Sequence, residues 1–234
     1  MKQSIIKNGL LLGGFALACT AAVALVNDAT KDRIAEQQRL ELSRILHQIV
    51  PDDIHDNDLS ASCILVTEPD ALGSIDPMPV YLGTKGGKPV ALAIETIAPD
   101  GYNGNIRLIV GVDTKGEVLG IRTLSHQETP GLGDKIELRK DDWVLGFNGK
   151  RFEASNPAPW RVKKDGGEFD QFTGATITPR AYLNAISRTL TLVEKQKADW
   201  FKRPLGCHPE KAADADALAT DASDTDASNT DGND

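Results

Sequence analysis

The segment Asp170–Thr176, DQFTGAT, combines an acidic residue, two threonines and two small residues just before a helical stretch. Thr178-Pro179 follows, a pair typical of a helix start with threonine as N-cap and proline at the first helical position. The free N–H groups and the dipole of a helix N-terminus favour a phosphate. Thr176 is therefore a candidate to hold a phosphate-bearing group, with Gly174 and Ala175 leaving room beside the backbone.

Two further segments have the composition of binding loops. His126–Gly133, HQETPGLG, is polar, contains one proline and two glycines, and has a single apolar residue, Leu132. Loops of this kind carry binding residues on a rigid scaffold. The second segment, Gly101–Gly104, has the sequence GYNG, and Tyr102 is available to pack against an aromatic ring.

Each segment also has a simpler interpretation. The heptapeptide fits a plain turn before a capped helix, with Thr173 and Thr176 as turn hydroxyls. The polar loop fits an ordinary surface connection that leads into a helix capped at Asp134. A single tyrosine such as Tyr102 often fills the edge of a core. Taken one at a time, the segments do not decide between these interpretations.

In combination, the three segments resemble one family. The chain reads Gly-Tyr-x-Gly, then His-x-Glu-Thr-Pro-Gly-Leu-Gly, then Asp-Gly-Gly-x-Phe-Asp-Gln-Phe-Thr-Gly-Ala-Thr-Ile-Thr-Pro. This order is similar to the G subunit of Rnf-type ion-translocating electron transport complexes. The C subunit of the sodium-translocating NADH:quinone reductase is a close cousin, but it typically reads Ser-Gly-Ala-Thr where this chain has Thr173. The resemblance covers nearly the whole chain except the acidic C-terminal tail.

The resemblance implies a set of FMN-binding residues. Thr176 would be esterified through its hydroxyl to the FMN phosphate, and Asp170 is the acidic position of the flavinylation motif. Thr173, Gly174 and Ala175 complete that motif. The positions implied along the isoalloxazine ring are Glu128, Thr129, Leu132 and Gly133, and Tyr102 is expected to contribute to the same cofactor site.

The expected role is a one-electron relay in which the flavin carries the redox chemistry. A threonine hydroxyl needs activation before it attacks a phosphoanhydride. No catalytic residues are evident, so a separate Mg-dependent flavin transferase with FAD as donor is expected, as in the family. There is no Gly-x-Gly-x-x-Gly motif after a strand for a nicotinamide. The alternatives are the quinone-reductase subunit, a free-standing redox domain, and a membrane-tethered scaffold without cofactor.

The elements that must position these residues are strands followed by a helix. Strands are expected over 89–97, 105–113 and 117–124, with an earlier one near 80–83. Further strands are expected at Phe152 and at 160–164, and a short helix over 135–143. The last helix is expected from about Pro179 to Phe201. The fold class is therefore α+β: one FMN-binding domain, 51–205, with an antiparallel sheet and flanking helices.

The N-terminal segment predicts a membrane anchor. Residues 9–26 contain no charged side chain. The length of this uncharged stretch is about the minimum for a membrane-spanning helix. A cleaved signal peptide and a lipoprotein at Cys19 are the alternatives. We expect a cytoplasmic N-terminus over 1–8, a single transmembrane helix over 9–27 and a stalk helix over 28–50 that packs on the domain and ends at Pro51. The domain is then expected in the periplasm of a bacterium, on the inner membrane, next to other subunits of the complex.

Charge and cysteine content bear on the C-terminal tail, on the possible partners and metals, and on disulfide formation. The net charge is −8, and the stretch 208–234 carries eight acidic residues against Lys211 alone. We therefore expect residues 206–234 to form a disordered acidic tail. No basic patch is seen, so nucleic acid is not an expected partner. The four histidines are scattered and no Cys-x-x-Cys occurs, so no metal site is expected. Cys63 and Cys207 either pair or stay free.

Overall fold

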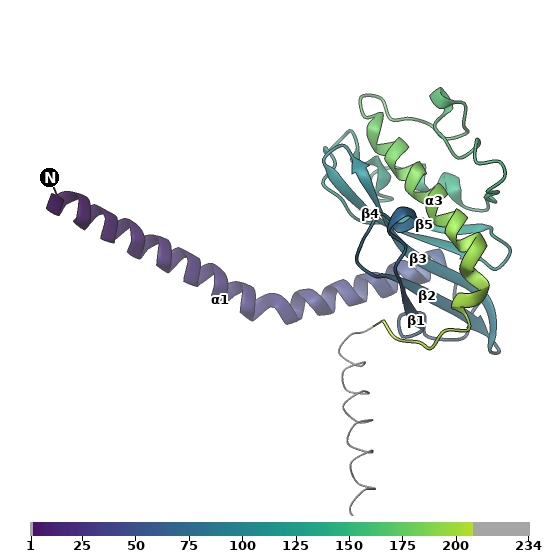
Figure 1. Ribbon diagram of the computed structural model, residues 1–234, viewed down its shortest axis with the longest axis horizontal. Helices are drawn as coiled ribbons and strands as arrows, with labels where there is room; N and C mark the ends of the chain where they lie inside the picture. Colours follow the sequence, from purple (N-terminus) through teal and green to yellow (C-terminus); the bar gives the residue numbers. More distant parts are fainter. Residues whose placement is uncertain (1, 208–234) are drawn as a thin grey trace, which may run out of the picture. The chain divides into compact units, whose positions relative to one another are not determined.

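The computed structural model describes residues 2–207. The helices are α1 (Lys2–Ile49), α2 (Pro69–Leu72) and α3 (Ile177–Trp200). The strands are β1 (Cys63–Val66), β2 (Met78–Lys85), β3 (Lys88–Gly101), β4 (Gly104–Asp113) and β5 (Val118–Ser125), and three short 3-10 helices are η1 (Asp134–Ile136), η2 (Asp142–Phe147) and η3 (Lys163–Asp165). Figure 1 shows this order, which confirms the expected α+β class.

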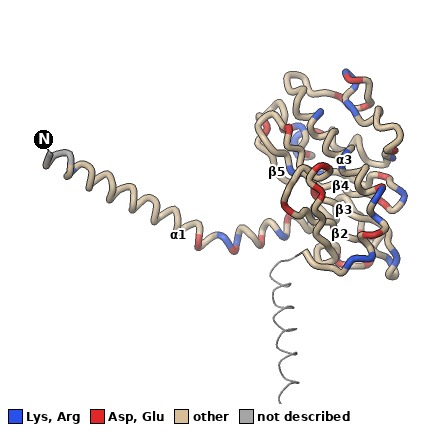
Figure 2. Tube along the Cα trace, in the orientation of Figure 1, with Lys and Arg blue, Asp and Glu red and all other residues tan. Residues whose placement is uncertain are grey.

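The chain divides into two compact units at Arg44. The first unit consists of α1 up to that residue. The N-terminal part of α1 contains a long stretch without charged residues (Figure 2). In the sequence this stretch is 9–26, and charged residues resume at Asp28. An 18-residue window of α1 has a mean hydropathy of 2.2, so this helix is long and apolar enough to cross a membrane by length and composition.

The second unit is built on a five-stranded antiparallel sheet in the order β1-β2-β3-β4-β5. Each strand pairs with the next along the chain, and β3 and β4 form the longest pair, from Ala91↔Asp113 to Gly101↔Gly104. The three strands expected over 89–124 are therefore confirmed. The short edge strand β1 was not expected, because four residues carry too little alternation to distinguish a strand from a loop.

α3 packs on one face of this sheet (Figure 1). The strands send alternate side chains toward it, since neighbouring residues of a strand point to opposite faces. Leu92 and Ile94 of β3 lie in the same buried cluster as Tyr182, Ile186 and the other apolar residues of α3. The polar pair Thr96 and Thr189 is also buried there, and the two hydroxyls are 2.9 Å apart.

The opposite face of the sheet is covered by the end of α1. Ile49 is buried over Gly111 and Gly120, which are partners across β4 and β5. A Cβ at Gly120 would lie 2.9 Å from Cγ2 of Ile49, so the glycine pair leaves the space that this side chain fills. Within the second unit, the end of the stalk expected over 28–50 is buried at Leu46, Ile49 and Val50.

Between β5 and α3, the chain forms loops and 3-10 helices rather than the expected elements. The helix expected over 135–143 is replaced by η1 and η2. The strands expected at Phe152 and 160–164 are absent from the described chain, where only isolated bridges such as Val162↔Phe169 occur. Burial there comes from aromatic contacts: the Phe147 ring centroid lies 4.4 Å from that of Phe169 and 5.1 Å from that of Trp143.

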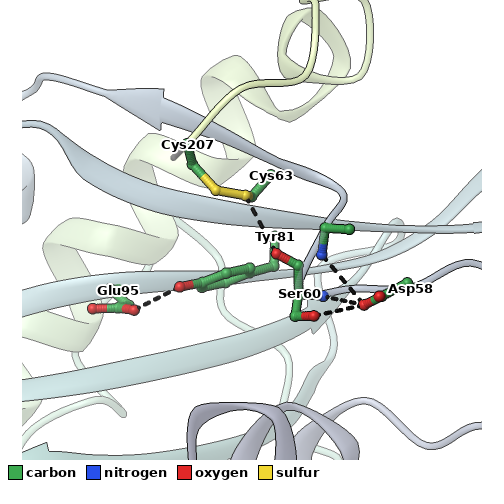
Figure 3. Close-up of a disulfide and its surroundings, with 7 residues drawn as sticks. Asp58, Ser60, Cys63, Tyr81, Glu95 and Cys207 are labelled. Atoms are coloured by element: carbon green, nitrogen blue, oxygen red, sulfur yellow. Dashed lines mark hydrogen bonds between the residues drawn. A yellow bond between two sulfur atoms is a disulfide. The ribbon is translucent and has the colours of Figure 1, made fainter. Parts of the chain in front are cut away.

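A disulfide joins Cys63 at the start of β1 to Cys207, and the two Cα atoms are 5.5 Å apart (Figure 3). The Gly206 N–H donates to the Cys63 carbonyl oxygen at 2.8 Å, so the chain after α3 returns to the edge of the sheet. The expectation that the tail begins at residue 206 is therefore wrong for Gly206 and Cys207. The remainder of the expected tail, 208–234, lies outside the described residues.

Candidate functional site

A pocket of about 260 Å³ opens where three separate parts of the second unit meet. They are the β3–β4 hairpin tip, the loop after β5 and the N-terminus of α3. Its lining consists of Tyr102, Glu128, Thr129, Leu132, Gly133, Gly174, Ala175, Thr176, Ile177 and Thr178. The structure therefore brings together eight of the ten site residues expected from the sequence.

Glu128 connects the three parts of the pocket. Its side chain is buried, and Oε1 accepts a hydrogen bond from the Asn103 backbone N–H at 3.1 Å. Oε2 accepts a short hydrogen bond from the Thr178 hydroxyl. Within residues 2–207 no Lys, Arg or His nitrogen forms a salt bridge with this carboxylate, so its partners there are neutral donors. A buried carboxylate held only by hydrogen bonds is sensitive to the loss of any one of them.

His126 holds the start of the loop through both ring nitrogens. Nδ1 accepts the backbone N–H of Glu128 at 3.0 Å, so the proton of the neutral ring is on Nε2. Nε2 then donates to Glu137 Oε1 at 2.7 Å. Burial acts to raise the pKa of Glu137, but the hydrogen bonds from His126 and Arg139 outweigh it and hold that pKa below its usual range. The loop is therefore fixed before any ligand binds.

The loop comes into close contact with α3 at Gly133. A Cβ there would lie 2.8 Å from Oε2 of Glu128 and 2.9 Å from the hydroxyl of Thr178, so only glycine fits without displacing that pair. On the outer side of the loop, Leu132 is 41% exposed at the pocket mouth. A Cβ at Gly174 would meet Cδ2 of Leu132 at 3.3 Å, which places the loop directly against the Thr173–Thr176 segment.

Thr176 occupies the N-cap position of α3, with the helical angles φ −82° and ψ −21°. Its side chain makes no capping hydrogen bond, so the hydroxyl is not used by the helix. The expected cap at Thr178 is wrong, because that residue lies inside the first turn and its hydroxyl is directed to Glu128. The free N–H groups of this first turn lie beside Thr176, as anion binding requires.

Asp170 and Thr173 lie outside the pocket lining. Both are exposed, while Phe169 and Phe172 between and beside them are buried. The Asp170 carboxylate lies 2.7 Å from Lys163 Nζ, and its backbone carbonyl accepts from Trp143 Nε1 at 2.9 Å. The aromatic side chains therefore anchor this segment and leave its polar side chains on the surface.

The rim of the pocket is apolar and open. Tyr102 is 63% exposed at the hairpin tip, so the interpretation as a core-edge residue is wrong. Ile177 is 47% exposed at the start of α3. Together with Leu132, these side chains offer exposed apolar surface in the same pocket as the buried Glu128 and Thr176. Such a site suits a planar aromatic ring that carries a phosphate.

Sequence reasoning missed two lining residues, Ile177 and Thr178. An apolar residue directly after the Gly-Ala-Thr motif was a usable signal for Ile177, because the first residue of a surface helix is usually exposed. The role of Thr178 had no such signal, since its partner Glu128 is 50 residues away in the sequence.

Comparisons with known proteins agree with this location. Residues 101–191 match the family model described as FMN-binding domain, and residues 1–49 match the one described as RnfG N-terminal region. The first range contains all ten site residues expected from the sequence.

Curated relatives cover most of the chain. A protein of Shewanella amazonensis, named as the G subunit of an ion-translocating oxidoreductase complex, is 74% identical over 92% of this chain and 100% of its own length. Proteins of the same name from Shewanella loihica and Vibrio parahaemolyticus are 60% and 52% identical, each over 88% of this chain and 98% of their own length.

Proposed function

Because this chain belongs to the family of G subunits of ion-translocating oxidoreductase complexes, we propose that it is a membrane-anchored flavoprotein subunit that relays electrons through FMN bound covalently to Thr176. The observation that carries the proposal is the unused hydroxyl of Thr176 at the N-terminus of a 24-residue helix, inside a pocket with an apolar rim. FMN needs both features, a position for its phosphate and a surface for its ring.

The residues of the pocket fit FMN in the following way. The first-turn N–H groups of α3 and the helix dipole stabilise the phosphate next to Thr176. Gly174, at φ +82°, and Ala175 keep the backbone there free of bulky side chains. Tyr102, Leu132 and the loop residues Thr129 and Gly133 border the ring. When bound, FMN supplies the electron-accepting and electron-donating chemistry, and the protein supplies its position and surroundings.

Attachment is proposed to require a separate flavin transferase. The Thr176 hydroxyl would attack the FMN phosphorus of FAD, the bond to AMP would break, and the hydroxyl proton would leave to a base on the transferase. Glu128, the carboxylate that lines the same pocket, is engaged by Asn103 and Thr178. The exposed Asp170 and Thr173 are then available as recognition residues for the transferase.

α1 is proposed to span the bacterial inner membrane once, with residues 1–8 in the cytoplasm and the FMN-binding unit in the periplasm. The Cys63–Cys207 disulfide supports this orientation, since structural disulfides persist in oxidising compartments. The stretch 9–26 contains no ionisable residue except Cys19, so the ion path of the complex is assigned to other membrane subunits.

Two of the three alternatives from the sequence, the quinone-reductase subunit and the scaffold, are less well supported. The relatives carry the name of the G subunit of an ion-translocating oxidoreductase complex rather than that of a quinone-reductase subunit. A scaffold without a cofactor does not account for the match to the FMN-binding domain.

The test is the intact mass of the full-length chain, denatured after co-expression with a flavin transferase. The expected result is a gain equal to FMN less one water on the peptide that contains Thr176. Thr176→Ala should abolish this gain while the chain stays folded, and Thr173→Ala should fold normally and lower the yield. Covalent FMN on Thr176→Ala would refute the site. An unmodified wild-type chain, with the transferase active on a control protein, would favour the scaffold.

A further inference from the structure

A second group of chemically capable side chains lies at the junction between α1 and the sheet. His47 is in the last turn of α1, and Asp52 and His55 follow the turn at Pro51. One donor atom from each lies within 4.8 Å of the others. Asp52 Oδ1 is 2.5 Å from His47 Nδ1 and 3.7 Å from His55 Nε2. This cluster is separate from the flavin pocket and shares none of its lining residues.

His55 is the unusual member of the cluster. Its side chain is only 5% exposed, and Nδ1 lies 2.9 Å from the backbone carbonyl oxygen of Asn57. A carbonyl oxygen can only accept, so Nδ1 carries a proton and donates it. In the neutral ring, Nε2 is therefore a bare lone pair. That atom is buried and has no hydrogen-bond partner among residues 2–207.

A buried nitrogen lone pair without a hydrogen-bond partner is unfavourable, and a cation bound to both this nitrogen and the nearby carboxylate would satisfy it. His47 Nδ1 faces the same carboxylate oxygen, and the centroids of the two imidazole rings are 6.3 Å apart. A single divalent cation satisfies both neutral rings and the carboxylate together. The N–H of His55 donated to a backbone carbonyl is also the usual outer contact of a metal-ligating histidine.

We propose that His47, Asp52 and His55 bind one divalent transition-metal ion, best represented by Zn²⁺. Two imidazole nitrogens and one carboxylate oxygen form a donor set suited to Zn²⁺, and they leave a fourth position for water. His47 and Asp52 are exposed, so an ion can enter from solvent. The exposed Asp56 nearby adds negative charge that attracts a cation.

The turn that carries Asp52 and His55 is held in place by β2. The Asp56 N–H donates to the Thr84 carbonyl oxygen at 2.9 Å. The Asn57 side chain donates to the Leu82 carbonyl oxygen at 2.8 Å and accepts from the Thr84 N–H at 2.7 Å. The backbone next to His55 is therefore held in place before an ion binds, and His55 is the donor that needs the least ordering on binding. Bound metal would in turn tie the last turn of α1 to the edge of the sheet.

The sequence predicts no metal site here. The usual signal is a pair of histidines or cysteines at short spacing, and the sequence has no such pair. The spacing of this cluster is His-x4-Asp-x2-His, interrupted by Pro51. Only the turn at that proline brings the end of α1 back against the residues that follow it.

The test is Zn²⁺ titration of the full-length flavin-loaded protein, expressed without a polyhistidine tag, purified in detergent and treated with a chelator. Calorimetry should give one Zn²⁺ per chain. His55→Gln and Asp52→Asn should each weaken Zn²⁺ binding at least about tenfold. Loss of a hydrogen-bond partner of a metal ligand already lowers affinity by about that factor, and loss of the ligand itself should lower it further. Asp53→Asn, which removes the same charge one residue away, should bind as the wild type does.

Two further readouts separate a ligand role from a folding role. Co²⁺ should give the visible bands of a four-coordinate site in the wild type and lose them in His55→Gln. Zn²⁺ should raise the thermal midpoint of the wild type and of Asp53→Asn, but not that of Asp52→Asn. Absence of Zn²⁺ binding by the wild type, or equal affinity in wild type and His55→Gln, would overturn the proposal. Flavin attachment is measured separately by mass, so failure of this site leaves the assignment of Thr176 intact.

Discussion

Glu128 is the residue on which the geometry of the flavin pocket depends. It joins the hairpin tip, its own loop and α3 through one backbone N–H and one hydroxyl. A carboxylate can accept at both oxygens, whereas an amide of the same shape has one acceptor and one NH₂ donor. Replacement by glutamine would therefore leave either the Asn103 N–H or the hydroxyl proton of Thr178 without its acceptor.

We expect Glu128→Gln to lower the free energy of unfolding by about 1–3 kcal/mol, because one buried donor loses its acceptor. It should also reduce the yield of covalent FMN, since the loop and α3 no longer meet in the same way. Chemical denaturation and intact mass measure the two effects. Gln127→Ala, at the exposed neighbouring position, is the matched control. Wild-type stability in Glu128→Gln would contradict this role.

At this scale, the sequence identified residue types but not partners. Thr178 looked like an N-cap because a threonine before a proline has that local preference. In the fold, the hydroxyl of Thr178 instead donates a hydrogen bond to the carboxylate of Glu128, which lies in another part of the chain. The local preference of a residue does not reveal a partner so distant in the sequence. The helix was therefore expected to start at Pro179, whereas it starts at Ile177.

The elements meet through side chains of matched size on the two faces of the sheet. α3 covers one face with large apolar residues, while the end of α1 lies on the other face over two glycines. The sequence predicted the longer strands because their alternation is strong. It missed β1, whose four residues carry too little alternation and which pairs with β2. It also assigned strands around Phe152 and Trp160, whose burial comes from ring contacts.

Gly120→Val tests the packing of α1 on the sheet. The new side chain would occupy the space of Ile49, and overpacking of this kind lowers stability by about 1–3 kcal/mol. Gly146→Ala is the control, because its Cβ would meet no atom within 4 Å. Urea unfolding of the two variants should differ in midpoint. Equal midpoints would show that the end of α1 contributes little to the stability of the sheet.

The whole second unit is closed by the disulfide and contains two tyrosines whose hydroxyls lie away from solvent. Burial raises the pKa of Tyr81, and the negative charge of Glu95, which accepts its hydroxyl proton, raises it further (Figure 3). Burial also raises the pKa of Tyr182, whose hydroxyl lies 3.1 Å from that of Thr123. Both pKa shifts favour the protonated form in the folded protein.

These shifts predict loss of stability in alkali. Above about pH 10, near the unperturbed pKa of tyrosine, the unfolded chain releases protons that the folded chain retains, so the free energy of unfolding falls as pH rises. Below about pH 10 both tyrosines are protonated in the folded and the unfolded chain, and their contribution to the free energy of unfolding is fully present. Denaturant unfolding between about pH 8 and pH 11.5 should show this slope, and Tyr182→Phe should reduce it. Tyr102→Phe, at an exposed ring, is the control. An unchanged slope in Tyr182→Phe would show that Tyr182 does not cause the loss of stability in alkali.

Removal of the disulfide should lower stability through the unfolded chain. It links residues 144 apart, and a loop of that length corresponds to about 5 kcal/mol in the chain-entropy model, with about 2–4 kcal/mol more usual in practice. Thermal unfolding of the Cys63→Ser, Cys207→Ser double variant measures the effect. Midpoints that coincide with those of the wild type would mean that the contacts of β1 suffice without the bond.

The same disulfide decides what happens when the backbone is cut. All ten residues assigned to the cofactor lie between Cys63 and Cys207, and so does the exposed stretch 153–158, a natural target for a protease. A single cleavage there would give two fragments that remain one molecule on a non-reducing gel and separate only when a reductant is added. With FMN on Thr176, as proposed, the flavin would then stay joined to α1 through the disulfide bond rather than through the peptide backbone.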